Sequence, residues 1–250
     1  MVGVAKGRSG SGAERADRTD PGGDSREGAT LLGLQMGAGR REALAVRVLG
    51  LTGNIACGKS SVAAALRQLG ARTIDADTVV HGLYRRGTDT YRLVVERFGE
   101  AVAGEDGVRR AELAKRVFGD PAAMADLEAL VHPAVIAEVR RLLDAPGQEP
   151  AAVIEAIKLV EGETAALVEA LWIVTASRES QLRRIAASRA ISEADALRRI
   201  RAQSSPHEKA KLFAEKRPGA PVVYIENDGP FQDTRRRVEE EWQMFLRGRA

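Results

Sequence analysis

The sequence has 250 residues, of which 44% are hydrophobic, and its formal net charge at pH 7 is +3. This length suits a single α/β domain with insertions, and the small charge excess gives no support for nucleic acid as a partner. No apolar run approaches the roughly 18 residues of a membrane span, so no membrane association is expected. The single cysteine excludes an intramolecular disulfide. Together with the lack of an apolar signal segment, it predicts a cytoplasmic protein.

The first 43 residues differ in composition from the rest of the chain. Gly, Ser, Arg and Asp dominate them, and apolar residues are scattered until Leu31 and Leu32. Such a segment buries too little surface to offset the entropy lost on ordering. We therefore predict a disordered tail over residues 1–43 and a folded domain over residues 44–250. Met36 is an alternative start site, which would leave much of the tail out of the protein.

Residues 53–60 form the first chemical motif. They read Gly-Asn-Ile-Ala-Cys-Gly-Lys-Ser, the G-x-x-x-x-G-K-S pattern of a phosphate-binding loop. An apolar segment over residues 45–51 predicts a strand before the loop, and Val62, Leu66 and Leu69 predict a helix after it. This strand–loop–helix context argues against a chance match in a glycine-rich turn.

The loop residues have distinct expected roles. Gly53 and Gly58 allow a tight turn that brings backbone N–H groups close to an anion, and the helix N-terminus adds partial positive charge. Lys59 can reach the terminal phosphates of a nucleoside triphosphate, and Ser60 can hold Mg²⁺. The residues predicted to bind the nucleotide are Gly53, Asn54, Ile55, Ala56, Cys57, Gly58, Lys59, Ser60 and Ser61.

The next predicted strand covers residues 71–77, and two residues with carboxylate side chains lie at its end. Asp75 and Asp77 stand at its carboxyl end, and ligands of doubly wound sheets gather at the carboxyl ends of the strands. Asp77 is therefore a candidate for chemistry, with the alternative that it only caps the following helix. A lone helical histidine more often packs or caps than catalyses, so we expect His81 to be structural or adjacent to the substrate.

Helical patterns then continue over residues 78–145 without an intervening strand. Three apolar stripes at helical spacing follow one another. Pro133 lies inside the third stripe and is expected to kink or split that helix. A turn rich in Pro and Gly follows over residues 145–150. Together these segments predict a helical lobe, residues 78–150, inserted into the core.

Three further strands and a basic helical region complete the pattern. Apolar runs predict strands over residues 152–157, 171–176 and 221–225. Between the last two lies an arginine-rich pair of helices, whose second member is expected to begin at a capping pair of Ser192 and Asp195. A final helix starts near Phe231. The predicted fold is α/β, a five-stranded parallel-sheet P-loop NTPase core with an inserted helical substrate lobe and an Arg-rich helical lid.

The chain lacks the D-x-x-G and N-K-x-D signatures of GTPase switches. It also lacks the second strand of the hydrophobic-Asp-Glu type that is typical of P-loop motors. Its plan is that of the nucleoside-monophosphate-kinase-like enzymes, and within them residues 46–242 resemble dephospho-CoA kinase. The most specific matches are the Asp75-Ala76-Asp77-x-x-x-His81 run and the His132-Pro133 pair. The other matches are residues 50–60, Leu130, Val131, Gln181, Arg184, Arg189, Arg199, Gln203 and Asn227.

The resemblance implies transfer of the γ-phosphoryl group of ATP, with Mg²⁺ held by Ser60, to the ribose 3′-hydroxyl of dephospho-CoA, the last step of coenzyme A synthesis. It implies catalytic roles for Lys59, Asp77, Arg184 and Arg189. Asp77 would lie against the acceptor hydroxyl, and the two arginines would move in with the lid. Asn227 is expected beside the nucleotide. The residues expected to contact the acceptor are Asp77, His81, His132, Glu161, Arg199 and Gln203.

The predicted domain has three parts: a core (44–77, 151–177 and 218–250), the substrate lobe (78–150) and the lid (178–217). Two positions depart from the family's pattern. Lys158 puts a charge where the family is apolar, and Ala190 replaces the acid of an Arg-Asp pair in the lid. Both bear on acceptor binding more than on phosphate chemistry. The residues leave open another small-molecule P-loop kinase or a non-catalytic ATP-binding regulatory module, and they leave the oligomeric state undetermined.

The composition of the tail generates the first prediction. Deleting residues 2–43 should leave kinase activity essentially unchanged, because a segment with so few apolar residues contributes little to a packed core. Steady-state rates of the full chain and the truncated protein, measured side by side, test this expectation. A large loss of activity on truncation would show that the tail has a function.

Overall fold

The protein is described by a computed structural model in which residues 46–188 and 192–248 are placed. The predicted tail, residues 1–43, and the predicted catalytic Arg189 lie outside the described residues. All elements below belong to one unit, residues 44–250.

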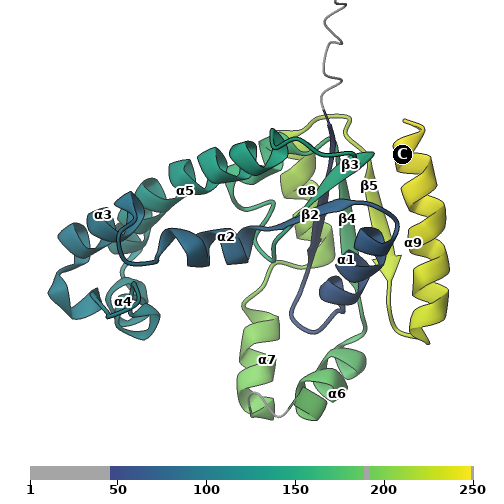
Figure 1. The fold of residues 1–250 in the computed structure, drawn as a ribbon. Coiled ribbons are helices and arrows are strands. Elements are labelled where there is room, and N and C mark those ends of the chain that lie inside the picture. The colour runs from purple at the N-terminus through teal and green to yellow at the C-terminus, as the bar shows by residue number, and fades with distance from the viewer. Residues whose placement is uncertain (1–45, 189–191, 249–250) are drawn as a thin grey trace, which may run out of the picture. The chain divides into compact units, whose positions relative to one another are not determined.

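Five parallel strands form the centre of this unit, as predicted. They are β1 (Arg47–Gly53), β2 (Arg72–Asp75), β3 (Ala151–Glu155), β4 (Ala170–Thr175) and β5 (Val222–Glu226), in the spatial order β2-β3-β1-β4-β5. Each neighbouring pair runs parallel. Parallel neighbours need crossover connections, and the chain supplies them with helices on both faces of the sheet. Figure 1 shows the arrangement.

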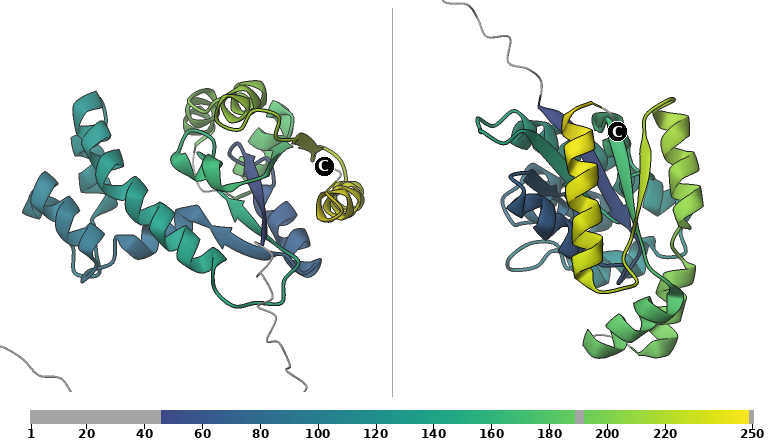
Figure 2. Two further views of the ribbon diagram at one scale, coloured as in Figure 1. Left: turned by 90° about the horizontal axis from the view of Figure 1, so that it is seen from above. Right: turned by 90° about the vertical axis from the view of Figure 1, so that its right-hand side faces the viewer.

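One face of the sheet packs against α1 (Lys59–Gln68) and α9 (Phe231–Leu246). Alternate strand residues point to this face, among them Leu51 and Trp172, which are both fully buried. Val62 and Leu66 of α1 meet the α9 residues Val238, Trp242 and Phe245 there. The final helix was predicted to begin near Phe231, and the structure confirms this start. The right-hand view of Figure 2 shows α9 running across the sheet.

The opposite face carries a second core cluster. Ile154, Leu171 and Ile173 point to it from the strands, and Phe213 of α8 (Pro206–Lys216) packs on them. The short 3₁₀ segment η2 (Glu163–Leu167) and the C-terminal part of α5 (Pro121–Leu143) cover the rest. Within the described residues, no helix combines the length and apolarity needed to cross a membrane.

The helical lobe is built from α2 (Ala76–Leu83), α3 (Asp89–Phe98), η1 (Glu100–Val102), α4 (Arg110–Val117) and α5. In Figure 1, α2 and α5 extend from the sheet side by side and carry α3 and α4 at their far ends. Val94, Phe98, Leu113 and Val131 form a small core between these helices. The lobe is therefore joined to the sheet through the same apolar cluster that covers β3 and β4.

Two details of the prediction need correction. Pro133 does not split its helix, because α5 runs from Pro121 to Leu143 without interruption. The missing hydrogen bond of Pro133 is tolerated where Val131, Val135 and Val139 bury one side of the helix in the lobe and core. Residues 178–217 form three helices, α6 (Arg178–Ser188), α7 (Glu193–Arg201) and α8, and only α6 and α7 project from the sheet, since α8 packs on β4.

The packing of α9 generates a stability prediction. Trp242 is fully buried, and its ring stacks on Phe245 with 5.7 Å between the centroids. Trp242→Ala should lower the free energy of unfolding by about 3–5 kcal/mol, because it removes a large buried side chain and leaves a cavity. Met244→Ala on the same helix is the matched control. Met244 is 37% exposed, so its loss should cost under about 0.5 kcal/mol. Urea denaturation followed by circular dichroism measures both, and equal losses would contradict this account.

Candidate active site

The carboxyl ends of the strands meet along one edge of the sheet, and the predicted site residues gather there. β1 ends at Gly53 and leads into the phosphate-binding loop, β2 ends at Asp75, and β3 ends at Glu155. Asn227 directly follows β5. Below this edge, α6 and α7 project from the core, and α2 leaves it toward the helical lobe, as Figure 1 shows. Open parallel sheets bind their ligands at this edge.

The phosphate-binding loop, residues 53–60, needs its glycines for conformation and for space. Gly58 has φ +91°, and a Cβ atom on it would lie 2.0 Å from Nδ2 of Asn227. A Cβ atom on Gly53 would lie 2.7 Å from the carbonyl oxygen of Val174. Ala56 adopts φ +58°, a left-handed conformation that costs a non-glycine residue roughly 1–2 kcal/mol. The N-terminus of α1 has no side-chain cap, so its amides are oriented to bind an anion.

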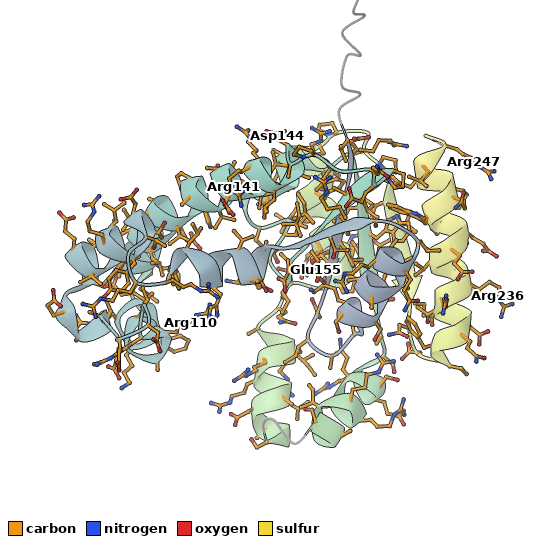
Figure 3. The ribbon with its side chains drawn as sticks, viewed as in Figure 1. Arg110, Arg141, Asp144, Glu155, Arg236 and Arg247 are labelled. Carbon is orange, nitrogen blue, oxygen red and sulfur yellow. The ribbon has the colours of Figure 1, made fainter. Side chains whose placement is uncertain are left out.

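Lys59 forms an ion pair with Glu155 across the sheet edge. Its Nζ atom lies 3.0 Å from Oε2 of Glu155, and the two side chains are 15% and 9% exposed. The pair is nearly buried, so it fixes the Lys59 ammonium beside the loop. Figure 3 labels Glu155 at the lower end of the sheet, on the side of α6 and α7.

The side chains of Asn227 and Arg184, which lie later in the chain, stabilise the loop by hydrogen bonds to its carbonyl groups. Asn227 is buried, and its Nδ2 donates to the carbonyl oxygen of Cys57 at 2.9 Å while its Oδ1 accepts from Thr234. Arg184 donates from Nη1 to the carbonyl of Ala56 at 3.1 Å and from Nη2 to the carbonyl of Asn227 at 2.5 Å. The structure therefore places Arg184 against the loop, and its charge is already at the predicted phosphate site.

A pocket of about 650 Å³ opens in front of the loop. Its lining combines loop residues with side chains from the lid and from the segment after β5. The predicted site residues among its lining are Asn54, Ile55, Ala56, Gly58, Lys59, Ser60, Ser61, Arg184, Arg199 and Asn227. Arg199 was expected to contact the acceptor, but it lines this pocket in front of the loop and not the pocket that Asp77 lines. This volume and the basic lining suit a nucleoside triphosphate.

The two aspartates of the D-A-D run have different positions. Asp75, not Asp77, is the N-cap of α2, because its Oδ1 accepts from the amides of Asp77 at 2.9 Å and Thr78 at 3.2 Å. The alternative that Asp77 only caps the helix is therefore wrong. Asp77 lies in the first turn of α2, and its side chain lines the neighbouring pocket.

Burial raises the pKa of the Asp77 carboxyl above its usual value, and the negative charge of Asp75 raises it further. Lys59, the Ile157 backbone N–H and Arg110 act in the opposite direction. Asp77 is thus coupled to the loop lysine on one side and to an arginine of the helical lobe on the other. A carboxylate with a raised pKa is a better proton acceptor than an ordinary one.

The pocket that Asp77 lines has a volume of about 360 Å³ and lies between α2, α5 and the segment after β3. Val80, Leu127 and Val131 supply an apolar wall. The polar members of its lining are Asp77, Tyr84, Glu128, His132, Lys158, Glu163 and Thr164. His132 therefore reaches the predicted acceptor side, and the unusual Lys158 adds a cation to the same pocket.

Three other predicted acceptor residues lie elsewhere. Glu161 is paired with the buried Lys209 at 2.8 Å and accepts from Ser204. Gln203 uses its Oε1 to accept the amide of Ile55 at 2.8 Å, so it contacts the loop. His81 lines a different pocket in the helical lobe. None of the three lines the pocket of Asp77.

Sequence reasoning did not assign two residues that the structure brings to the site. Glu155 was given no role from the sequence, yet it forms the ion pair that holds Lys59. Lys209 lies in α8 and donates to the carbonyl of Ile157 and to Glu161. The carboxyl end of a buried strand next to the loop was a usable signal for Glu155. Lys209 had no such signal, because its partners are about 50 residues away in sequence.

No cluster of three or more His, Cys, Asp or Glu side chains that could hold a metal ion occurs among the described residues. This is compatible with the expected Mg²⁺, because Mg²⁺ in nucleotide sites takes few protein ligands and is bound largely by phosphates and water. Ser60 is exposed at the N-terminus of α1 and lines the nucleotide pocket, so its hydroxyl is available as that ligand.

Comparison with known proteins identifies the family of this chain. A family model described as dephospho-CoA kinase matches residues 47–228. The chain belongs to the dephospho-CoA kinase family. A dephospho-CoA kinase from Symbiobacterium thermophilum is 40% identical over 206 residues, covering 81% of this chain and 83% of the relative. A dephospho-CoA kinase from Geobacter sulfurreducens is 36% identical over 200 residues, covering 79% of this chain and 98% of the relative.

Solved structures support the same fold. TT1252 from Thermus thermophilus has a TM-score of 0.66 at 31% identity, covering 79% of this chain and 97% of that chain. A dephospho-CoA kinase from Campylobacter jejuni has a TM-score of 0.55 at 22% identity, covering 81% and 98%. The predicted α/β P-loop fold of this family member is thereby confirmed.

The coupling of the two aspartates predicts a pH effect. Asp75→Asn should move the acid limb of the pH profile of kcat/KM to lower pH. It removes a charge that raises the pKa of Asp77, so Asp77 stays ionised, and able to accept a proton, at lower pH. Asparagine keeps an oxygen for the cap. Asp120→Asn is the control, because Asp120 caps α5 in the same way, away from the site. An unmoved limb, or one moved to higher pH, contradicts the coupling.

Proposed function

We propose that this protein transfers the γ-phosphoryl group of ATP to the ribose 3′-hydroxyl of dephospho-CoA, giving coenzyme A. The observation that carries this proposal is that Asp77 lines a pocket of about 360 Å³ and interacts electrostatically with Lys59 of the phosphate-binding loop. The candidate proton acceptor, Asp77, and the candidate phosphate-binding cation, Lys59, would thus act in the same cleft. Membership of the dephospho-CoA kinase family supplies the acceptor's identity.

The nucleotide would bind along the loop, with Gly58, Lys59 and Ser60 at its phosphates. When bound, ATP and Mg²⁺ supply the phosphoryl group and the metal charge that offsets negative charge during its transfer. Ser60 is the protein ligand we assign to Mg²⁺. Arg184 and Arg199 would neutralise phosphate charge from the lid side of the pocket. Asn227 would act indirectly, by holding the loop.

On the acceptor side, Asp77 would orient the ribose hydroxyl and accept its proton as the oxygen attacks. Glu155 would position Lys59, since the two form a nearly buried pair. His132 lies in the same pocket as Asp77 and is available to contact the acceptor. Roles for Arg189, His81, Glu161 and Gln203 remain predictions from the family resemblance.

A coupled ADP-release assay tests the proposal. The purified protein, with Mg²⁺ and ATP, is given dephospho-CoA or a panel of nucleosides and sugars. We expect ADP release with dephospho-CoA and a product that mass spectrometry identifies as coenzyme A. A clear preference for a nucleoside or sugar would identify another small-molecule P-loop kinase. ATP binding without turnover of any acceptor would support a regulatory module.

Substitution of Asp77 generates a sharper prediction. Asp77→Asn keeps the shape of the side chain but removes its charge, so single-turnover chemistry should fall by roughly 10²–10⁴, the usual contribution of a general base. The melting temperature and ATP affinity should stay nearly unchanged, because Asp77 belongs to neither apolar core cluster and does not line the nucleotide pocket. Asp75→Asn should show the reverse, losing more stability and less chemistry. Normal turnover by Asp77→Asn would remove Asp77 from the mechanism.

A further inference from the structure

A second pocket in the helical lobe has no role in the function described above. It has a volume of about 420 Å³ and lies between α2 and the turn that precedes α4. Its charged lining residues are His81, Arg85, Arg109 and Arg110, with Glu105 and Asp106 at the turn. Three permanent cations therefore face two carboxylates in one small cavity.

The turn that carries Arg109 and Arg110 is held rigidly against the end of α2. Val108 donates its amide to the carbonyl of Tyr84 at 2.9 Å, and Arg86 donates its amide to the carbonyl of Asp106 at 3.0 Å. Gly107 permits this approach, because a Cβ atom there would lie 2.3 Å from the carbonyl oxygen of Tyr84. A basic pocket with a fixed backbone is prepared for binding before the ligand arrives.

Among the described residues, some arginines of the helical lobe are paired with carboxylates, and others, such as Arg86, Arg116 and Arg140, are not. Arg92, Arg97 and Arg141 each form an ion pair with a carboxylate. Among the residues that the structure describes, no ion pair involves Arg85, Arg109 or Arg110. The N-terminus of α4, where the last two lie, also has no side-chain cap. Unpaired guanidinium groups beside an uncapped helix N-terminus favour an anionic ligand.

The basic pocket adjoins the acceptor pocket. Tyr84 lines both of them, and the guanidinium carbon of Arg110 lies 5.9 Å from the centre of its ring. Arg110 also acts on Asp77, where its positive charge offsets part of the rise in the pKa of the carboxyl. Figure 3 shows Arg110 beside α4, below α2. An acceptor with its reacting hydroxyl at Asp77 can thus extend past Tyr84 toward the arginines.

We propose that this basic pocket binds the diphosphate group of the acceptor, with Arg85, Arg109 and Arg110 as its ligands. The inference rests on the proposed function, which supplies an acceptor with a diphosphate next to its reacting ribose. Guanidinium groups bind phosphate oxygens in pairs of parallel hydrogen bonds, which fixes orientation as well as charge. The pocket would select acceptors that carry a diphosphate over plain nucleosides.

Equilibrium binding of dephospho-CoA, measured by calorimetry with a non-hydrolysable ATP analogue present, tests this assignment. Arg85→Ala and Arg110→Ala should each raise the Kd for dephospho-CoA by about 10- to 100-fold, since each removes charge-assisted hydrogen bonds. Arg110→Lys should restore only part of the affinity, because lysine lacks the planar fork. Arg86→Ala is the matched control. Arg86 is an exposed neighbour that does not line the pocket, and its loss should leave the Kd unchanged.

Three further readouts separate this role from a structural one. The KM for ATP should not change in any variant, and melting temperatures should match, because Arg85 and Arg110 are exposed. The Kd for adenosine, which has the ribose but no diphosphate, should be the same in Arg110→Ala as in the unsubstituted protein. The salt dependence of dephospho-CoA binding should weaken in both alanine variants, since fewer phosphate charges are neutralised.

The outcomes are distinguishable from those of the proposed function. Suppose that the unsubstituted protein turns over dephospho-CoA, but that Arg85→Ala and Arg110→Ala have the same Kd for dephospho-CoA as Arg86→Ala. The proposed function then stands, and the subsite is overturned. The subsite is also overturned if, of all the variants, only Lys158→Ala weakens the binding of dephospho-CoA while leaving the binding of adenosine unchanged. It is overturned as well if Arg110→Ala raises the Kd for adenosine as much as the Kd for dephospho-CoA. If the unsubstituted protein neither binds nor turns over dephospho-CoA, both fail together.

Discussion

The close approach of the phosphate-binding loop to the sheet is the constraint on which the rest of this structure depends. Gly53 leaves no room for a side chain beside the carbonyl of Val174, and Gly58 leaves none beside Asn227. Ala56 is held in a left-handed conformation between them. Such a backbone persists only where its surroundings over-determine it. Here Asn227 and Arg184 do so, through hydrogen bonds to the carbonyls of Cys57 and Ala56.

A second set of contacts ties the lid region to the same loop. Gln203 accepts the amide of Ile55, and the side chain of Asn54 donates to the carbonyl of Ser204. Ser204 in turn donates to Glu161, which pairs with Lys209, a lysine that is only 1% exposed. A buried pair of this kind contributes more to fixing one arrangement than to net stability. The residues after α7 are thus fastened to the loop through polar contacts.

The helical lobe makes the site asymmetric in its electrostatics. The loop side concentrates positive charge from Lys59, Arg184 and Arg199 around a large polar pocket. The pocket that Asp77 lines is smaller and more apolar. Burial and Asp75 raise the pKa of the Asp77 carboxyl, and the charges of Lys59 and Arg110 act against this rise. The Asp77 side chain is therefore influenced by charges on both sides of the cleft.

The sequence by itself determined the five strands, the loop, the lobe and the family, because these follow from local periodicity and from motifs that are contiguous in the chain. It also singled out Asp77 as the candidate for chemistry. It could not assign Glu155 to Lys59, 96 residues away, or Glu161 and Gln203 to contacts with Lys209 and the loop. It assigned α8 to the lid, because a basic amphipathic helix has the same sequence pattern whether it projects from the sheet or packs on it. Only the tertiary structure decides such pairings, since they depend on which surfaces the folded sheet brings within a few ångströms.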